Sequence, residues 1–255
     1  MSSAEKIESI LKKINRNNET ALVPFFTAGY PQLDSFASDL INISKVGDVV
    51  EIGVPFSDPM ADGMTIQRSS HQALINGVSL KWIFDQIEAV SDQLQAPLVM
   101  MSYLNPLLAF GYEELAQRAK KVGIGGFIVP DLPLEESYEL QSSLENMGLG
   151  LIQLITPATP IDRMVDLCAA SKGFVYAVTM TGITGSDSGL ATNLAKYLDQ
   201  ICGITDLPVC AGFGVRSAED VKMIGRHAAG AIVGSALVEV MERKEDFVGF
   251  LERLR

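Results

Sequence analysis

The stretch Pro208-Val-Cys-Ala-Gly-Phe-Gly-Val-Arg-Ser-Ala-Glu-Asp-Val-Lys-Met-Ile-Gly225 contains one complete strand–loop–helix unit. Its apolar run at residues 208–211 predicts a strand that is buried on both faces. A glycine turn follows at residues 212–214. Ser217 then fits a helix N-cap, and the two acids that follow suit the first turn of a helix over residues 217–225.

The same unit repeats along the whole chain. Apolar runs predict eight strands, at residues 22–26, 48–52, 97–101, 126–129, 150–155, 173–178, 208–211 and 230–233. Amphipathic stretches between and after them predict helices at residues 33–46, 80–94, 112–122, 134–147, 161–170, 193–202, 217–225 and 236–254. Asp34 and Ser79 fit N-caps of two of these helices. Ahead of the first strand, an apolar stripe predicts an extra helix within residues 1–17; the stripe consists of Ile7, Ile10, Leu11 and Ile14.

Eight strand–helix repeats indicate an α/β fold, a TIM (β/α)8 barrel with an extra N-terminal helix. We expect residues 1–255 to form a single domain, because no linker or low-complexity segment interrupts them. A doubly wound open sheet is the alternative. That fold usually has fewer strands and a GxGxxG motif after the first one, and Phe26-Thr-Ala-Gly-Tyr30 is not that motif.

The composition argues against several classes of function. The 255 residues are 47% hydrophobic and carry a formal net charge of −11, so nucleic acid and anionic membranes are poor partners. The three cysteines form no CxxC pair and the two histidines lie far apart, which predicts neither a disulfide framework nor a metal site. No signal-type stretch and no membrane-spanning apolar run is seen. We therefore expect a reduced, soluble, cytoplasmic protein.

The expected barrel indicates where catalytic groups should be sought, namely at the C-terminal ends of the strands. None of the lysines lies there, which argues against Schiff-base chemistry, and no nicotinamide or flavin fingerprint is present. Proton transfer by carboxyl groups remains. Glu51 sits inside the apolar strand Val49-Val-Glu-Ile-Gly-Val54, where burial would raise its pKa toward that of a general acid/base. A salt-bridged structural Glu51 is the alternative.

Two acids, Asp58 and Asp62, follow in the proline-containing loop at residues 55–63, where a solvated turn is as good an interpretation as a catalytic one. Asp131 ends the fourth strand, and on its own a structural role is favoured. Glycines follow the sixth, seventh and eighth strands, at residues 181–189, 212–214 and 234–236. They favour a backbone site for a phosphate group, although tight strand–helix turns would also explain them. The segment Thr181–Thr192, which contains the first of these loops, has the composition of a mobile active-site lid.

Together these residues identify a family. Glu51-Ile-Gly-Val-Pro-Phe-Ser-Asp-Pro-Met-Ala-Asp-Gly63 resembles the signature of the tryptophan synthase α subunit family. Six further blocks fall in family order: Val23–Pro31, Tyr103–Pro106, Pro130–Pro133, Thr181–Gly185, Gly212–Val215 and Gly234–Ala236. The resemblance implies a TIM-barrel lyase that cleaves indole-3-glycerol phosphate to indole and glyceraldehyde 3-phosphate. It also implies an αββα complex with a β subunit that holds pyridoxal phosphate (PLP), so this chain would need no cofactor or metal.

By the same resemblance, Glu51 is the general acid/base and Asp62 is the carboxylate that stabilises positive charge on the indole ring. The other substrate- and phosphate-binding positions are Phe25, Tyr103, Tyr176, Thr184, Gly185, Phe213, Gly214, Gly234 and Ser235. Residues 56–63 and 105–107 match surfaces that face the β subunit, where Pro59, Met60, Pro106 and Leu107 would suit an interface. Met64 departs from the proline that the family commonly has, which predicts a more flexible loop.

Two other functions stay open at this point. One is a non-catalytic α-like subunit that only activates a β partner, against which the retained Glu51, Asp62 and glycine loops argue. The other is a different phosphosugar barrel enzyme, such as indole-3-glycerol phosphate synthase or phosphoribosylanthranilate isomerase. The synthase would be expected to carry strand-end lysines, which are missing here.

Overall fold

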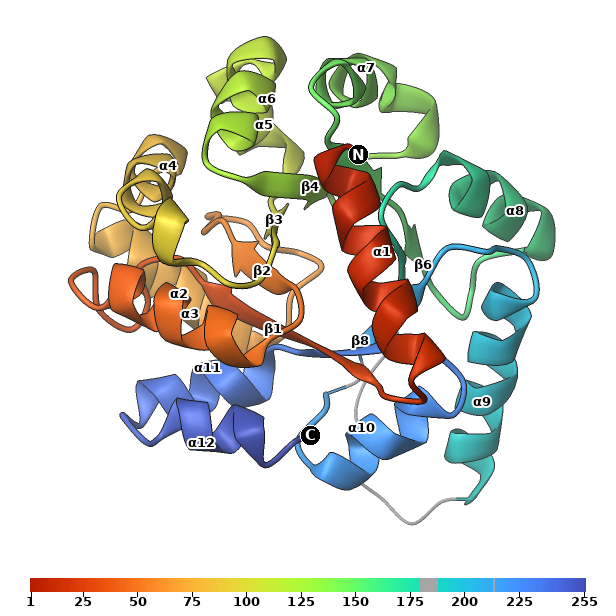
Figure 1. The fold of residues 1–255 in the computed structure, drawn as a ribbon. Helices are drawn as coiled ribbons and strands as arrows, with labels where there is room; N and C mark the ends of the chain where they lie inside the picture. The colour runs from red at the N-terminus through yellow and green to blue at the C-terminus, as the bar shows by residue number, and fades with distance from the viewer. Residues whose placement is uncertain (179–187, 213) are drawn as a thin grey trace.

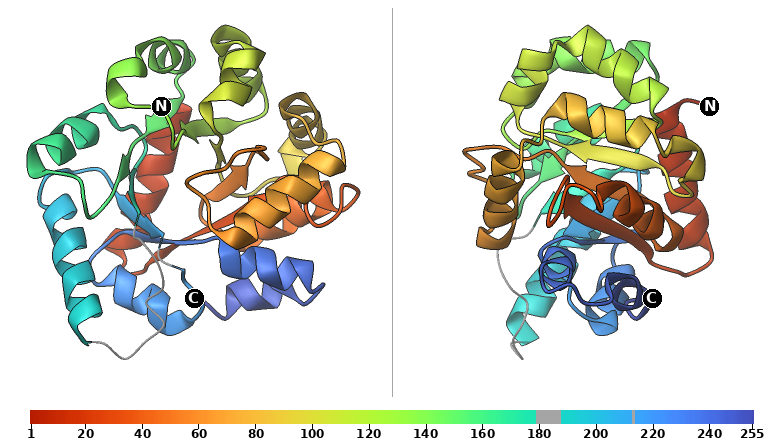
Figure 2. Two further views of the ribbon diagram at one scale, coloured as in Figure 1. Left: turned by 180° about the vertical axis from the view of Figure 1, so that it is seen from behind. Right: turned by 90° about the vertical axis from the view of Figure 1, so that its left-hand side faces the viewer.

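The architecture is a barrel of parallel strands surrounded by helices (Figures 1 and 2). It was obtained as a computed structural model, which describes residues 1–178, 188–212 and 214–255. The strands are β1 Ala21–Thr27, β2 Val50–Gly53, β3 Leu98–Met101, β4 Ile124–Ile128, β5 Gly150–Ile152, β6 Leu154–Ile155, β7 Val175–Val178, β8 Val209–Gly212 and β9 Gly230–Val233. Each lies within two or three residues of a predicted run, and the predicted TIM barrel is confirmed.

All strand pairs are parallel, in the order β5-β4-β3-β2-β1-β9-β8-β7-β6. The fifth predicted run, residues 150–155, is split into β5 and β6 at Gln153. The Gln153 N–H donates to the Ser171 hydroxyl (3.0 Å) instead of to a strand, which interrupts the ladder. β5 pairs with β4 and β6 pairs with β7, so the chain itself closes the barrel at this point.

The helices form the outer ring. They are α1 Ser3–Arg16, α2 Phe36–Val46, α3 Met64–Ile75, α4 Leu80–Glu88, α5 Leu104–Phe110, α6 Tyr112–Lys121, α7 Tyr138–Asn146, α8 Ile161–Ala170, α9 Ser188–Cys202, α10 Ala218–Gly225, α11 Ser235–Glu242 and α12 Phe247–Glu252. Two 3-10 turns, Ser91–Gln93 and Leu134–Glu136, occupy parts of two predicted helices. Among the described residues, no helix combines the length and apolarity that crossing a membrane requires.

Several helix predictions need correction. Asp34 is not an N-cap, because α2 starts at Phe36 after Ser35, whose hydroxyl donates to Asp39 instead. The predicted helix at residues 236–254 is broken into α11 and α12 by a turn in which Lys244 has a φ of 56°. By contrast, the other two predicted caps are confirmed: the Ser79 hydroxyl accepts from an amide of the first turn, and Ser217 forms a capping box.

Two helices were not predicted. The buried face of α3 includes the small or polar residues Ser69, Ser70 and Ala73. Its sequence therefore lacks the regular spacing of large apolar residues by which a helix is recognised. α5 is only seven residues long. Met64, at the position where the family commonly has proline, is the first residue of α3, a place where proline would also fit.

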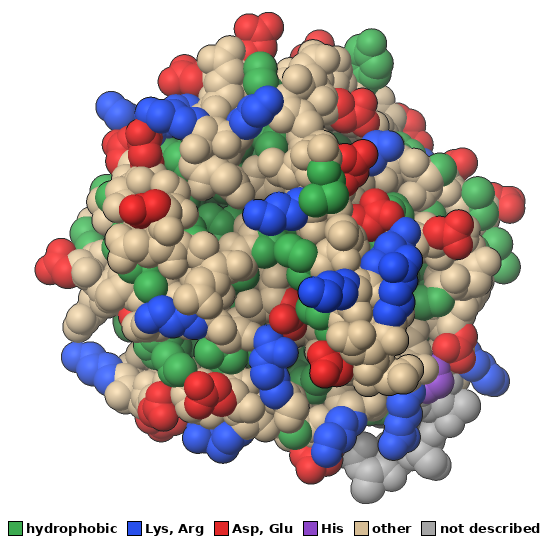
Figure 3. Space-filling model, in the orientation of Figure 1, with side chains coloured by type: hydrophobic (Ala, Val, Ile, Leu, Met, Phe, Trp, Pro, Cys, Tyr) green, Lys and Arg blue, Asp and Glu red, His purple; other side chains and the backbone are tan. Residues whose placement is uncertain are grey.

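The extra helix α1 lies across the end of the barrel where the strands begin (Figure 1). Its Ile7 and Leu11 are fully buried, and Gly125 leaves the space that the Ile7 side chain fills, since a Cβ there would lie 2.5 Å from Ile7 Cδ1. On this face, basic and acidic side chains are interspersed (Figure 3). The opposite end, where the strands finish, is thereby left for the site.

Candidate active site

Glu51 lies in the interior of the barrel. It is on β2, in register with Phe25 of β1 and Val99 of β3, and its side chain is completely buried. Neither carboxyl oxygen has a hydrogen-bond partner among the described residues. Burial, and next the charge of Asp62, raise the pKa of Glu51 to about 8. The group is therefore protonated at neutral pH, which makes its burial tolerable and leaves it with a proton to give.

Asp62 belongs to the loop between β2 and α3 and lines a cavity at the barrel mouth. Burial raises the pKa of its carboxyl to about 6, opposed by a hydrogen bond from the Tyr103 hydroxyl (3.3 Å). Asp62 is therefore largely ionised at pH 7 while Glu51 is largely protonated. Two neighbouring carboxyl groups with separated pKa values are the arrangement that general acid–base chemistry requires.

Tyr103 contacts the Asp62 loop through both its hydroxyl and its ring. Its hydroxyl accepts from the Ala61 N–H (2.8 Å) as well as donating to Asp62, and its ring stacks on Phe56 with the centroids 4.9 Å apart. Burial and the nearby Asp62 charge raise the pKa of Tyr103 to about 12, so the hydroxyl keeps its proton. Tyr103, which was predicted to contact substrate, lines a small pocket beside the cavity that Asp62 lines.

Asp131 has a structural position, as its sequence alone favoured. Its carboxylate accepts from the Leu104 N–H (2.9 Å), at the start of α5. α5 has no side-chain cap of its own at Tyr103, so Asp131 supplies an acceptor for a free helix N–H from a neighbouring loop. The same contact fixes the backbone that carries Tyr103.

The cavity at the barrel mouth has a volume of about 210 Å³ and opens at the strand ends. Phe25, Asp62, Tyr176, Gly214, Gly234 and Ser235 are among the predicted residues that line it. Two glycines make room for the aromatic rings. A Cβ on Gly53 would lie 2.5 Å from the Phe25 ring, and one on Gly212 would lie 2.8 Å from the Tyr176 hydroxyl. Burial, with the nearby charge of Glu51 next, raises the pKa of Tyr176 well above its ordinary value.

One end of the cavity is suited to an anion. Gly234 is the N-cap of α11 and has no side chain with which to cap it, and Gly234 and Ser235 both line the cavity. The free N–H groups and the dipole of a helix N-terminus attract negative charge. Gly214 joins them from the loop after β8 with a φ of 65°, a conformation that favours glycine.

The rest of the wall is apolar and was not predicted. It is formed by Ile66, Met101, Leu154, Val178 and Ile232, with Pro130. These side chains have the same residue types as the core, so the sequence distinguishes them only by their place at the ends of predicted strands. They give the cavity a surface suited to a flat aromatic ring.

Three predicted positions, Thr184, Gly185 and Phe213, lie outside the described residues, as does most of the predicted lid. Glu51 lies beneath the cavity and does not line it. Within residues 1–178, 188–212 and 214–255, no cluster of three or more His, Cys, Asp or Glu side chains is arranged to hold a metal ion.

The surface around the loop of residues 56–63 exposes apolar side chains. Met60 is 86% exposed and Met64 76%. In α5 the prediction for Leu107 is wrong: it is fully buried because it faces the barrel, and the next residue, Leu108, is 57% exposed instead.

The fold and the site define a TIM-barrel enzyme whose mouth combines two carboxyl groups of different pKa with a backbone site for an anion. A family model described as tryptophan synthase alpha chain matches residues 11–250. The tryptophan synthase alpha chain of Roseiflexus castenholzii is 41% identical over 240 residues, which cover 93% of this chain and 92% of the relative. That of Desulfosudis oleivorans is 40% identical over 255 residues, covering 98% and 96%.

Solved structures agree with these relatives. Tryptophan synthase from M. tuberculosis, in an open form with BRD0059 bound, contains a chain 32% identical with a TM-score of 0.85, covering 98% of this chain and 94% of that one. A protein from Aquifex aeolicus VF5 is 33% identical with a TM-score of 0.88, covering 100% and 98%. The chain belongs to the tryptophan synthase alpha chain family, as its motifs predicted. Members of this family are lyases that act on indole-3-glycerol phosphate in tryptophan biosynthesis.

Proposed function

We propose that this chain carries out the family's lyase reaction with Glu51 as general acid/base and Asp62 as the carboxylate that stabilises positive charge on indole. The observation that carries this proposal is the pair of neighbouring carboxyl groups with pKa values of about 8 and about 6. One is protonated and the other ionised at the same pH, beside a cavity that ends at a helix N-terminus.

The chemistry divides between the two groups. Glu51 gives its proton to C3 of the indole ring, which turns the ring into a cationic indoleninium and hence a good leaving group. The ionised Asp62 accepts a hydrogen bond from the ring N–H and stabilises that charge. The Glu51 carboxylate then takes the proton of the adjacent glycerol hydroxyl. The carbon–carbon bond breaks, its electron pair returns to the indole ring, and the hydroxyl carbon becomes the aldehyde of glyceraldehyde 3-phosphate.

The cavity supports a definite substrate orientation. Its apolar wall favours the indole ring near Asp62, with Phe25 and Tyr176 against the substrate. Gly214, Gly234 and Ser235 favour the phosphate at the start of α11, where backbone amides replace basic side chains. Thr184, Gly185 and Phe213 complete this proposal from the family motif alone. Because Glu51 lies beneath the cavity, we propose that its side chain moves toward the mouth when substrate binds.

The family name implies a β-subunit partner, and we propose the αββα assembly with PLP held by that partner. This chain would then need no cofactor or metal of its own and would act in the cytoplasm. The exposed Met60 and Met64, together with Leu108 of α5, support an interface at the barrel mouth. A partner placed there would receive indole directly from the site.

The test is indole release from indole-3-glycerol phosphate by the chain alone and after addition of a β subunit. We expect slow release alone and a large rise with the partner. Glu51→Gln and Asp62→Asn should each lower kcat by at least about 10²-fold, because each removes a proton-transfer or charge-stabilising group. Asp58→Asn changes an exposed carboxylate of the same loop and serves as the matched control for the chain alone.

Full turnover by either variant would refute the role assigned to that residue. Activation of the β subunit without any indole release would instead indicate a non-catalytic α-like subunit. Conversion of a phosphoribosyl-anthranilate compound would indicate another phosphosugar enzyme.

A further inference from the structure

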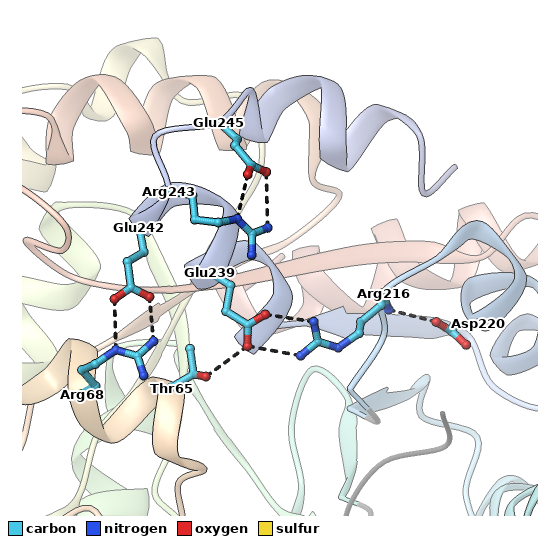
Figure 4. A network of polar contacts seen from close by, with 8 residues as sticks. All are labelled: Thr65, Arg68, Arg216, Asp220, Glu239, Glu242, Arg243 and Glu245. Carbon is cyan, nitrogen blue, oxygen red and sulfur yellow. Dashed lines mark hydrogen bonds and ion pairs between the residues drawn. The ribbon is translucent and has the colours of Figure 1, made fainter. Parts of the chain in front are cut away.

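A single carboxylate, that of Glu239 on α11, connects three segments around the barrel mouth (Figure 4). It accepts two hydrogen bonds from the Arg216 guanidinium, at 2.9 and 3.2 Å. It also accepts one from the Thr65 hydroxyl, at 3.1 Å. The Arg216 pair holds the pKa of Glu239 below its ordinary value, so Glu239 is ionised wherever the enzyme would work.

Each partner lies beside a residue of the proposed site. Thr65 is in the first turn of α3, three residues after Asp62. Arg216 is two residues after Gly214, in the loop that follows β8. Glu239 itself is four residues, one helical turn, after Ser235 at the N-terminus of α11. The three segments reach the mouth from distant parts of the chain, and this carboxylate bonds to both of the others.

Arg216 is held at its backbone as well. Its N–H donates to Asp220 (2.9 Å), and the same carboxylate accepts from the N–H of Ser217 in the capping box of α10. The guanidinium therefore projects from a fixed point. A two-pronged arginine–carboxylate pair specifies geometry as well as attraction, which a lysine could not reproduce.

We propose that Glu239 is a positioning residue that sets the spacing between the Asp62 loop, the Gly214 loop and the N-terminus of α11. This rests on the proposed function, in which Asp62 and the phosphate site must act on one substrate. Misplacing a catalytic group by about 1 Å can cost about 10²-fold in rate, so a contact that fixes this spacing affects catalysis without touching substrate.

The contacts of Glu239 contribute little to global stability. The Arg216 side chain is 50% exposed and that of Glu239 is 23% exposed, and solvent-accessible ion pairs add little to the free energy of unfolding. The same part of the chain offers a control whose arginine is similarly exposed: Arg243, 55% exposed, pairs with Glu245 in the turn between α11 and α12 and contacts neither site loop. Glu242 of α11, which pairs with Arg68 of α3 one turn further from the mouth, is a second comparison.

The experiment measures three quantities for wild type, Glu239→Gln, Arg216→Lys, Thr65→Val and the control Arg243→Gln. These are kcat and KM for indole release, the affinity for inorganic phosphate by titration calorimetry, and the urea midpoint of unfolding. For Glu239→Gln we expect kcat/KM to fall about tenfold and phosphate affinity to fall about threefold or more, with an unchanged urea midpoint. Arg216→Lys should resemble Glu239→Gln, and Arg243→Gln should match wild type.

A double variant, Glu239→Gln with Arg216→Lys, should lose no more than either single variant, because both changes disrupt one shared contact. If kcat/KM and phosphate affinity of Glu239→Gln equal those of Arg243→Gln, the positioning role is wrong. If wild type binds phosphate and Glu239→Gln binds it more weakly, but neither releases indole, positioning holds and the proposed reaction fails. If wild type neither binds phosphate nor releases indole, both fail.

Discussion

Two carboxyl groups at the barrel mouth differ in protonation because their surroundings differ. Glu51 has no partner among the described residues and is fully buried, so burial acts on it unopposed. Asp62 is only partly buried and accepts a hydrogen bond from Tyr103, which favours its ionised form. The environment, rather than the residue type, therefore assigns the acid and the anion.

The first prediction concerns the pH dependence of indole release. The reaction needs Asp62 ionised and Glu51 protonated in the free enzyme. We expect kcat/KM to rise through a pKa of about 6 and to fall through a pKa of about 8, which gives a bell with its maximum near pH 7. Measuring kcat/KM from about pH 5 to pH 9 checks this. If kcat/KM does not fall above about pH 8, the role of Glu51 as the general acid is contradicted.

The variant Tyr103→Phe tests the acid limb of the pH profile of kcat/KM, which is set by Asp62. The variant keeps the ring stacked on Phe56 but removes the hydroxyl that lowers the pKa of Asp62. The acid limb should therefore move to higher pH while the upper limb stays in place. The loss of kcat/KM should be larger at pH 6 than at pH 7.5, by about two- to fivefold. An equal loss at both pH values would mean that Tyr103 does not act through the Asp62 pKa.

A further residue-level prediction concerns stability. In the unfolded chain Glu51 ionises near 4.5, and in the folded protein near 8. Between these values the folded state binds the extra proton, so the buried carboxyl makes the protein less stable as pH rises. Glu51→Gln removes this effect. Its free energy of unfolding, relative to wild type, should increase by about 4 kcal/mol between pH 5 and pH 8.5.

Urea unfolding of both proteins at the two pH values checks this prediction. Asp58→Asn, which changes an exposed carboxylate a few residues away, provides the control and should show no such pH dependence. A constant difference between Glu51→Gln and wild type across the range would show that the Glu51 pKa is not raised.

Among the elements, the strands and most helices were predictable, and the reasons are specific. β8 and β9 are apolar on both faces; β8 ends at Gly212 and β9 is followed by Gly234, so both their burial and their ends are visible in the sequence. Glu51 was found because a charge in such a run is exceptional. α3 was missed because serines line its buried face, and the split at Gln153 depends on Ser171, eighteen residues away.

The residues of the cavity wall, by contrast, could not be predicted from the sequence. Met101, Leu154 and Ile232 differ from core residues only in facing an open space, and that property depends on how strands from distant parts of the chain meet. Tyr103 was associated with the site by its motif, but its contact with Asp62 was not predicted. Its hydroxyl reaches Asp62 from the start of α5, where Asp131 of another loop accepts from the Leu104 N–H.

This arrangement yields a prediction for α5. Asp131→Ala removes the acceptor of the Leu104 N–H, and should cost about 1 kcal/mol of stability together with a severalfold fall in kcat, because Tyr103 loses its fixed backbone. Asp131→Asn keeps an oxygen at the same position and is the matched variant. We expect it to retain most of the activity and stability. Equal losses in both variants would indicate a role for the Asp131 charge itself, rather than for the hydrogen bond.

For the whole molecule, the barrel separates the groups that stabilise it from those that act on substrate. Both the cavity and the exposed Met60 and Met64 belong to the loops and strand ends at one mouth. At the other end α1 closes the barrel across the strand starts (Figure 1), where its Ala4 N–H donates to the Gly148 carbonyl (3.3 Å). Changes at the closed end should therefore alter stability and leave the chemistry intact.

Ile7→Ala tests this separation. Ile7 is fully buried against Gly125, which has no side chain to fill the space that the truncation leaves. A cavity of this kind costs about 2–4 kcal/mol, so the urea midpoint should fall clearly. Lys6→Ala, one residue earlier on the exposed face of α1, should stay within about 0.5 kcal/mol of wild type. Under conditions where Ile7→Ala is folded, its kcat and KM should equal those of wild type. A kcat lowered in step with stability would show that the two ends of the barrel are coupled, and that α1 helps to hold the geometry of the mouth.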